Sequence, residues 1–324
     1  MRRLGIQTAR LAAAAALLAL AARLVGLQAL IEQLRRVDVA WFALAVLAMA
    51  ASQWASALRW AVIAAILGLK APPRELRIAY AQAMAVNVVL PGATLGGDTL
   101  RSVRLQRLGN PLGESALSVL LDRGSGLWIL CLLSLCAALA LWGSGQLDGL
   151  RLPALALPGL AAGLDARAAV GLYACALVLA LAVPFTPVRL PGAWASPGML
   201  GRLLGRLAEL HALTVSRAPA LLRSLWSSVL VQALCGLSLW ICLLAAGGTA
   251  GFWAVLAVAA PIFIAGAVPV SYGGFGAREL AAVLAAPLVG IDGQVALAAS
   301  ALYGIAAVLL GVAAAPLLVL VRRG

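Results

Sequence analysis

Charge is scarce in this sequence of 324 residues, because Asp, Glu, Lys and Arg together make up only 11% of it. An ordinary soluble domain has about 25% charged residues. Hydrophobic residues make up 64%, and several apolar runs exceed the ~20 residues that a helix needs to cross a bilayer. No long polar stretch remains that would fold as a soluble catalytic domain. We therefore predict an all-α, polytopic helical membrane protein whose residues 1–324 form a single integral membrane domain.

Side chains that bind metals or form disulfides are also few, with one histidine and five cysteines. The cysteines fall inside apolar runs, have no CxxC spacing and are odd in number, which argues against a metal centre or a disulfide framework. We interpret them as small buried hydrophobes, place the lone His211 at the membrane interface, and expect no metal and no cofactor. The cysteines are Cys131, Cys136, Cys175, Cys235 and Cys242.

The charge that is present is strongly basic, with a formal net charge of +13. The arginines lie at the ends of the apolar runs, as the positive-inside rule predicts for a membrane protein, so we expect no nucleic-acid partner. Basic ends suit anionic lipid headgroups. They also offer a cytoplasmic surface on which a soluble partner could dock. The sequence says nothing about the oligomeric state.

Six apolar runs are long enough to be full membrane spans. Met1–Ala22 resembles a signal peptide, but the apolar run resumes after Arg23, so we favour an uncleaved first span. Two pairs of shorter pieces flank glycine-rich breaks and are predicted to be re-entrant or broken helices. The predicted spans are 11–31, 40–66, 115–142, 167–187, 224–246 and 294–321, and the short pieces are 78–90 with 97–108 and 252–268 with 276–289.

The arginines also predict a topology, in which both chain termini lie in the cytoplasm and nearly every basic cluster lies on that side. Under this topology, span, break and span occur twice with opposite orientation, over residues 40–142 and 224–321. Inverted repeats with interrupted segments in corresponding positions typically mark a transport site near the bilayer midplane.

The first break follows Pro91, which lacks an N–H and ends the preceding helix near Val89. Gly96 and Gly97 permit unusual backbone and close approach of another chain or a ligand. Backbone of this kind is tolerated at membrane depth only where it is buried in protein or lines a wet cavity. The break is therefore a candidate working site.

Polar side chains surround this first break. We expect Asp98 to cap the following short helix, and Arg101 lies close behind it. Two interpretations stay open: a capped surface loop with solvated arginines, or a half-helix that presents its N-terminus and an arginine to a phosphate headgroup. Asn87 precedes the break, where its amide either satisfies freed backbone groups or faces a polar cavity.

The second break resembles the first, with Gly273 and Gly274 releasing the backbone and Ser271 and Tyr272 supplying hydroxyl groups. Arg278 and Glu279 follow at once. Because neighbouring residues on a helix do not face each other, we expect these two to pair with different partners. Ionisable residues within an apolar tract are candidates for function. A structural ion pair between the repeats is the competing interpretation.

Charges also lie inside two spans. Arg59 lies near the cytoplasmic end of the second span, and Asp122 and Arg123 lie in the third. Arg59 either extends to the interface or pairs with a carboxylate. We predict that Arg59 and Asp122 lie close together.

Three segments together resemble the transmembrane region of lysylphosphatidylglycerol synthases, a flippase-like family of bacterial and archaeal membrane proteins. They are Asn87–Arg101 (NVVLPGATLGGDTLR), Leu121–Trp128 (LDRGSGLW) and Pro269–Glu279 (PVSYGGFGARE). The resemblance covers nearly the whole chain. It implies a bacterial cytoplasmic membrane location and lipid handling, because this region of full-length members is held to flip aminoacylated phosphatidylglycerol between leaflets. Those members carry a C-terminal aminoacyl-tRNA-dependent transferase domain, and we expect no such activity here since the sequence stops at Gly324.

Stand-alone relatives connected with hopanoid lipids or polyprenyl-linked glycans leave the cargo open. We expect a lipid transporter that is not an enzyme. The alternatives are a membrane enzyme that uses Asp98, Asp122 or Glu279 as acid or base, and an accessory subunit in a lipid-linked pathway. The expected substrate-binding residues are Asn87, Gly96, Gly97, Asp98, Arg101, Asp122, Arg123, Ser271, Tyr272, Gly273, Gly274, Arg278 and Glu279.

Overall fold

A computed structural model describes residues 19–20, 33, 35–89, 95–148, 166–182, 218–268 and 274–318, which form helices and turns without a strand among them. Most of the expected first span and His211 lie outside these residues. The helices are α3 (Val39–Ile66), α4 (Pro73–Val89), α5 (Leu95–Arg107), α6 (Leu112–Gly143), α7 (Ala166–Ala182), α9 (Ala218–Ala245), α10 (Phe252–Ala267), α11 (Ala277–Ala285), the 3-10 helix η3 (Ala286–Val289) and α12 (Gly293–Ala314).

Four helices in the described part of the chain, α3, α6, α9 and α12, are long and apolar enough to cross a membrane. They confirm the spans predicted at 40–66, 115–142, 224–246 and 294–321. Helix α7 falls in the predicted span 167–187 and is described over 17 residues. All five cysteines are free, but Cys136 and Cys175 are exposed, so the prediction of burial was wrong for these two. An outward-facing cysteine is tolerated in a membrane helix because its thiol is weakly polar and sits well in lipid.

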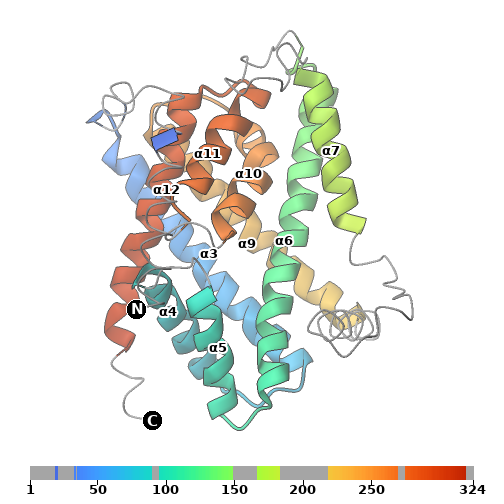
Figure 1. Cartoon of the computed structure of the whole chain (residues 1–324). Coiled ribbons are helices and arrows are strands. Elements are labelled where there is room, and N and C mark those ends of the chain that lie inside the picture. Colours follow the sequence, from blue (N-terminus) through green and yellow to red (C-terminus); the bar gives the residue numbers. More distant parts are fainter. Residues whose placement is uncertain are drawn as a thin grey trace.

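The short helices form two hairpins that enter from opposite ends of the bundle (Figure 1). Helices α4 and α5 pack together in the lower half of the view, and α10 and α11 pack together in the upper half. Neither hairpin traverses the full height of the bundle. The structure therefore agrees with the prediction of two re-entrant segments, although the connecting residues 90–94 and 269–273 lie outside the described part.

The helix contacts are symmetric under the exchange of α3–α6 with α9–α12. Helix α4 packs on α12 as α10 packs on α6, α5 packs on α6 as α11 packs on α12, and α3 packs directly on α9. This correspondence supports the interpretation that residues 40–142 and 224–321 form an inverted repeat within one membrane domain, which we propose as the organisation of the chain.

A hydroxyl group repairs the backbone where proline interrupts α10. Pro261 lies inside this helix, lacks an N–H, and disturbs the hydrogen bonds of the preceding turn. Ser134 of α6 inserts its Oγ there, donating to the carbonyl oxygen of Leu256 at 2.8 Å and accepting from the N–H of Ala260 at 3.1 Å. Serine side chains commonly replace lost helix bonds in membrane proteins in this way. The same contact fixes α10 to α6.

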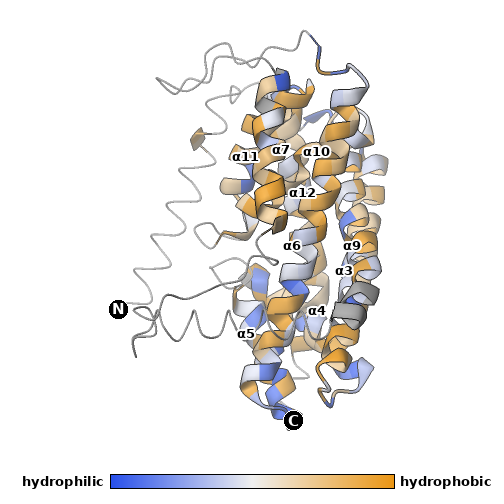
Figure 2. Ribbon diagram, turned by 90° about the vertical axis from the view of Figure 1, so that its right-hand side faces the viewer, coloured by the Kyte–Doolittle hydropathy of each residue, from blue (hydrophilic) through white to orange (hydrophobic). Residues whose placement is uncertain are grey.

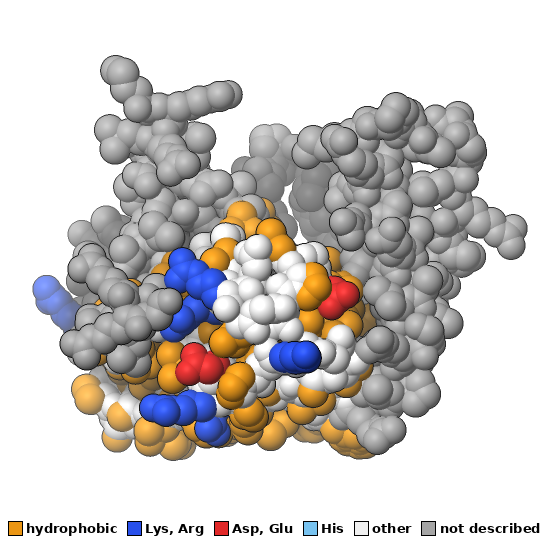
Figure 3. All heavy atoms as spheres, turned by 90° about the horizontal axis from the view of Figure 1, so that it is seen from below, with side chains coloured by type: hydrophobic (Ala, Val, Ile, Leu, Met, Phe, Trp, Pro, Cys, Tyr) orange, Lys and Arg blue, Asp and Glu red, His pale blue; other side chains and the backbone are white. Residues whose placement is uncertain are grey.

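Charge separates the two ends of the bundle, as the topology prediction requires. Hydrophobic residues cover most of its height in Figure 2, and basic side chains are prominent on the lower end seen in Figure 3. Among the described residues, the lower end carries more basic than acidic groups and the upper end carries equal numbers. The lower-end residues are Lys70, Arg74, Arg77, Arg104, Arg107, Glu75 and Glu114, and the upper-end residues are Arg35, Arg36, Arg167, Asp38, Asp148 and Asp292.

The first hairpin depends on close approach of its two helices at Gly97. A Cβ built on this residue would lie 2.7 Å from the carbonyl oxygen of Ala83 in α4, which is too close for a backbone atom. We predict that Gly97→Ala lowers the stability of the protein by about 1–3 kcal/mol, because the helices must move apart. The thermal unfolding midpoint in detergent measures this effect. Gly124→Ala is the matched control, since a Cβ there meets nothing within 4 Å. An equal loss in both variants would contradict the prediction.

Candidate functional site

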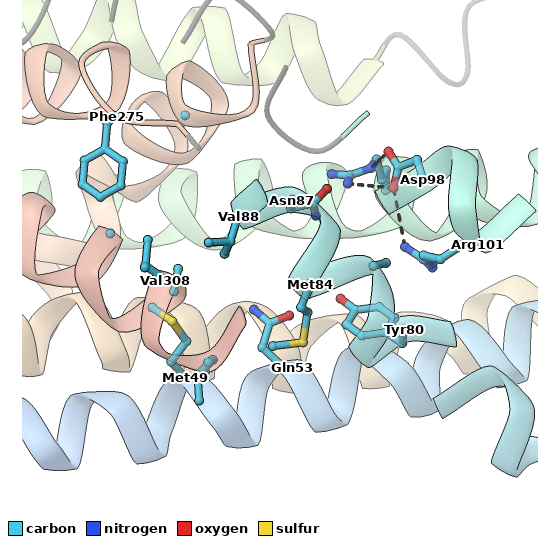
Figure 4. A pocket seen from close by; sticks show the side chains of 16 residues that line it. Met49, Gln53, Tyr80, Met84, Asn87, Val88, Asp98, Arg101, Phe275 and Val308 are labelled. Atoms are coloured by element: carbon cyan, nitrogen blue, oxygen red, sulfur yellow. Dashed lines mark hydrogen bonds and ion pairs between the residues drawn. The ribbon is translucent and has the colours of Figure 1, made fainter. Parts of the chain in front are cut away.

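A cavity of about 310 Å³ lies between the two hairpins, near the lower end of the usual range for ligand pockets, roughly 300–1,000 Å³. One end is polar and is formed by α4, α5 and α6. The other end is apolar and is formed by α3, α12 and the second hairpin. Figure 4 shows Asp98 and Arg101 at the polar end and Phe275 and Val308 at the apolar end.

The polar end rests on Asp122, which binds two arginines from two other helices. Its Oδ1 accepts a hydrogen bond from Nε of Arg59 at 2.8 Å, and its Oδ2 accepts one from Nη2 of Arg101 at 2.6 Å. The predicted proximity of Arg59 and Asp122 is confirmed. Asp122 follows the start of α6 by ten residues, or ~15 Å along the helix, which is about half the thickness of a hydrocarbon core. The carboxylate thus joins α3, α5 and α6 deep in the bundle.

The guanidinium of Arg101 lies against two aromatic rings. Its Cζ lies 4.2 Å from the ring centroid of Trp60 and 4.8 Å from that of Tyr80. Arg101 is only 4% exposed, and its Nε has no hydrogen-bond partner in the described part of the chain. Trp60 is fully buried. Cation–π attraction to the two rings and the hydrogen bond to Asp122 hold the guanidinium in this position.

A second ion pair lies beside the first and lines the cavity. Arg123 of α6 donates from both Nε and Nη2 to the carboxylate of Asp98, and the Nη2 distance is 2.8 Å. Asp98 was expected to cap the short helix, and that expectation was wrong. Helix α5 spans Leu95–Arg107, so Asp98 lies within its first turn and not before it, and its side chain pairs with Arg123. The Arg123 side chain is 37% exposed, which leaves it accessible from the cavity.

Asn87 performs both of the roles that the sequence left open. Its Oδ1 accepts a hydrogen bond from the backbone N–H of Gly97 at 2.9 Å, across the break from α4 to α5. The same side chain lines the cavity. Gly96 lies in the first turn of α5 beside Gly97. The glycines therefore allow close packing of helices, and Asn87 satisfies a backbone donor freed at the helix start.

The second hairpin has its own ion pair. Nη2 of Arg278 lies 2.7 Å from Oε1 of Glu279, so the expectation that these neighbours pair with different partners was wrong. Glu279 turns back to accept from the N–H of Gly276 at 2.6 Å, which brings its carboxylate to the start of α11 where Arg278 reaches it. Ser300 of α12 donates to the same Oε1 at 3.1 Å. Both charged residues are almost fully buried.

Arg278 does not line the cavity, although three residues in contact with it do. Gly266 and Gly304 pack against its side chain, and Phe275 lies under its guanidinium. Gly274 has a φ of +84° and lies against the backbone of Gly266, where a side chain would be both strained and crowded. The remaining candidates of this break, Ser271, Tyr272 and Gly273, lie outside the described residues.

The polar end carries an excess of positive charge. Among the described residues, Arg59, Arg101 and Arg123 pair with Asp98 and Asp122, which leaves one formal positive charge. In the second hairpin Arg278 and Glu279 cancel. Within the described residues, no three His, Cys, Asp or Glu side chains group as a metal site. The arrangement is suited to holding an anion.

Sequence reasoning missed two residues of this site. Gln53 lines the cavity from α3, and Trp60 supports Arg101 from below. An amide in an apolar span was a usable signal for Gln53. No signal in the sequence distinguishes Trp60 from the other tryptophans, because only the packing of α3 against α5 and α6 places it under an arginine.

Asp122→Asn should destabilise the protein strongly, because two buried guanidinium groups lose their shared counter-charge. Removing one partner of a buried ion pair typically costs about 3–5 kcal/mol. The control is Asp148→Asn, which removes an ion pair with Arg167 whose side chains are 42% and 56% exposed and should cost about 1 kcal/mol or less. Thermal unfolding in detergent compares the two. Similar midpoints for both variants would show that Asp122 is not a structural centre.

No curated protein matches the chain closely enough to count as a relative. A family model described as "Lysylphosphatidylglycerol synthase TM region" matches residues 7–315, nearly the whole sequence. With its apolar spanning helices, the chain is therefore an integral membrane protein that belongs to the lysylphosphatidylglycerol synthase transmembrane-region family.

Proposed function

We propose that this protein is a transporter that moves a lipid with an anionic headgroup between the two leaflets of a membrane. The observation that carries the proposal is the cavity between the two hairpins, which is polar and net positive at one end and apolar at the other. A lipid needs both surfaces, one for its headgroup and one for the adjoining apolar chain.

The arrangement of the hairpins supports movement across the membrane. Helices α4 and α5 enter from one end of the bundle, α10 and α11 enter from the other, and the cavity touches both pairs. Broken helices that meet near the midplane are the usual architecture of a site with alternating access. A headgroup bound there would be exposed to one leaflet or the other according to which hairpin moves.

Catalysis is less well supported, and we propose that the protein is not an enzyme. The three carboxylates that would act as acid or base are each bound by arginine: Asp98 by Arg123, Asp122 by Arg59 and Arg101, and Glu279 by Arg278. Both oxygens of each carboxylate already accept hydrogen bonds within the protein, so none of the three is placed to take a proton from a bound lipid.

For location, we propose a bacterial cytoplasmic membrane with the lower, more basic end of the bundle and both termini on the cytoplasmic side. The five basic residues of that end support the orientation by the positive-inside rule. Such a face would attract anionic lipids and would suit a soluble partner.

Reconstituted vesicles provide the test. Purified protein is placed in liposomes that contain acyl-labelled fluorescent phosphatidylglycerol, and dithionite then destroys the label in the outer leaflet only. We predict that label from the inner leaflet becomes accessible faster than in protein-free vesicles. Crossing no faster than in those vesicles would refute the proposal. Chemical conversion of the lipid, detected by mass spectrometry without crossing, would favour an enzyme.

Two matched variants connect transport to the cavity. Arg123→Gln removes a partly exposed guanidinium from the lining and should slow crossing, since one ionic contact to the headgroup is lost. Arg107→Gln removes an equal charge from the exposed end of α5 and should leave the rate unchanged. Equal effects of the two variants would mean that charge acts through the surface and not through the cavity.

A further inference from the structure

We propose that the cavity is selective for a phosphodiester headgroup that carries one negative charge and free hydroxyl groups, and that it discriminates against a headgroup with an added ammonium group. This inference rests on the proposed function and specifies its substrate class. It follows from three properties of the lining: its net charge, the hydrogen-bond donors left over, and the shortage of carboxylates.

The net charge of the polar end matches one anionic group. The charged lining residues are Arg101, Arg123 and Asp98, and the pair of Arg59 and Asp122, which does not line the cavity, is neutral, so a single formal positive charge remains. A phosphodiester neutralises that excess. A phosphomonoester carries about −1.5 to −2 charges at neutral pH and would leave a negative excess. The count therefore favours the diester.

Two guanidinium groups are placed to attract the phosphate. Arg101 and Arg123 both line the cavity, and the Arg123 side chain is 37% exposed. Nη2 of Arg101 is bound to Asp122, and its Nε has no partner among the described residues but is closed off from the cavity, so Arg101 contributes its charge. A phosphate beside Arg123 would receive a direct ionic contact from that side chain and the attraction of Arg101.

Two neutral amides in the cavity lining suit hydroxyl groups. Gln53 lines the cavity and makes no side-chain hydrogen bond within the described residues. Asn87 uses its Oδ1 for Gly97, and its Nδ2 makes no hydrogen bond in the same part of the chain. An amide group both donates and accepts, as a hydroxyl does, so these side chains fit a glycerol or sugar headgroup better than a bare phosphate.

An ammonium group would find no counter-charge in the lining. Among the described lining residues Asp98 is the sole carboxylate, and Arg123 already occupies both of its oxygens. An aminoacylated headgroup would bring additional positive charge into a site that already has an excess. Transfer of an unpaired charge from water to such a site is unfavourable.

Binding in detergent micelles tests the selectivity independently of transport. Short-chain phosphatidylglycerol is titrated into the protein by calorimetry, alongside short-chain phosphatidic acid, phosphatidylethanolamine and lysylphosphatidylglycerol. Phosphatidylglycerol should bind about tenfold or more tightly than each of the others, which corresponds to one charge-assisted hydrogen bond. Equal or tighter binding of lysylphosphatidylglycerol would overturn the inference.

Glycerophosphoglycerol, the same headgroup without acyl chains, should bind more weakly. If it binds as tightly, the ligand is a soluble phosphodiester and the lipid assignment is wrong.

Two variants localise the effect. Arg123→Gln should weaken phosphatidylglycerol binding about tenfold, and Arg107→Gln should not change it. Gln53→Leu keeps every charge and should weaken binding of phosphatidylglycerol while leaving that of phosphatidic acid unchanged. An unchanged affinity in both Arg123→Gln and Gln53→Leu would place the headgroup elsewhere.

Selective binding without leaflet crossing would leave this inference standing and contradict the proposal that the protein is a transporter. Leaflet crossing without selective binding would support the transporter and contradict this inference.

Discussion

The Asp122 carboxylate, bound by Arg59 and Arg101 inside a membrane bundle, is the interaction on which the rest of the structure depends. It joins α3, α5 and α6, and so holds the first hairpin against two full spans. Because an ion pair is costly to bury, it is stable only where the geometry is good and further hydrogen bonds satisfy the charged groups. Here the balance is incomplete by one positive charge, and that excess faces a cavity. The same residues therefore provide both the support of the hairpin and the attraction for a ligand.

The two hairpins are held in different ways. The first is bound to α6 by two ion pairs between helices, from Arg101 and from Asp98. The second keeps its ion pair within one hairpin, at Arg278 and Glu279, and reaches α12 through the hydroxyl of Ser300 and through glycines. The two hairpins therefore make corresponding helix contacts but carry different arrangements of charged residues. The anion site belongs to the first hairpin, and the second contributes apolar surface to the same cavity.

Much of this architecture is predictable from the sequence. Long apolar runs locate the spans, and proline with paired glycines locates the breaks, because these signals are local. The pair of Arg59 and Asp122 is also predictable, since two charges in neighbouring spans require a partner. The mutual pairing of Arg278 and Glu279 was not predictable, because it depends on the Glu279 carboxylate accepting a hydrogen bond from the N–H of Gly276 at the start of α11. The aromatic support of Arg101 depends on tertiary packing that no local pattern encodes.

The most direct test of the account is an experimental structure of the protein in lipid nanodiscs that contain phosphatidylglycerol. We predict density for a phosphate within hydrogen-bond distance of the Arg123 guanidinium and next to the Arg101 side chain, with Asp122 still bound to Arg59 and Arg101. A cavity that holds acyl chains alone, with the headgroups remaining at the membrane surface, would contradict the account.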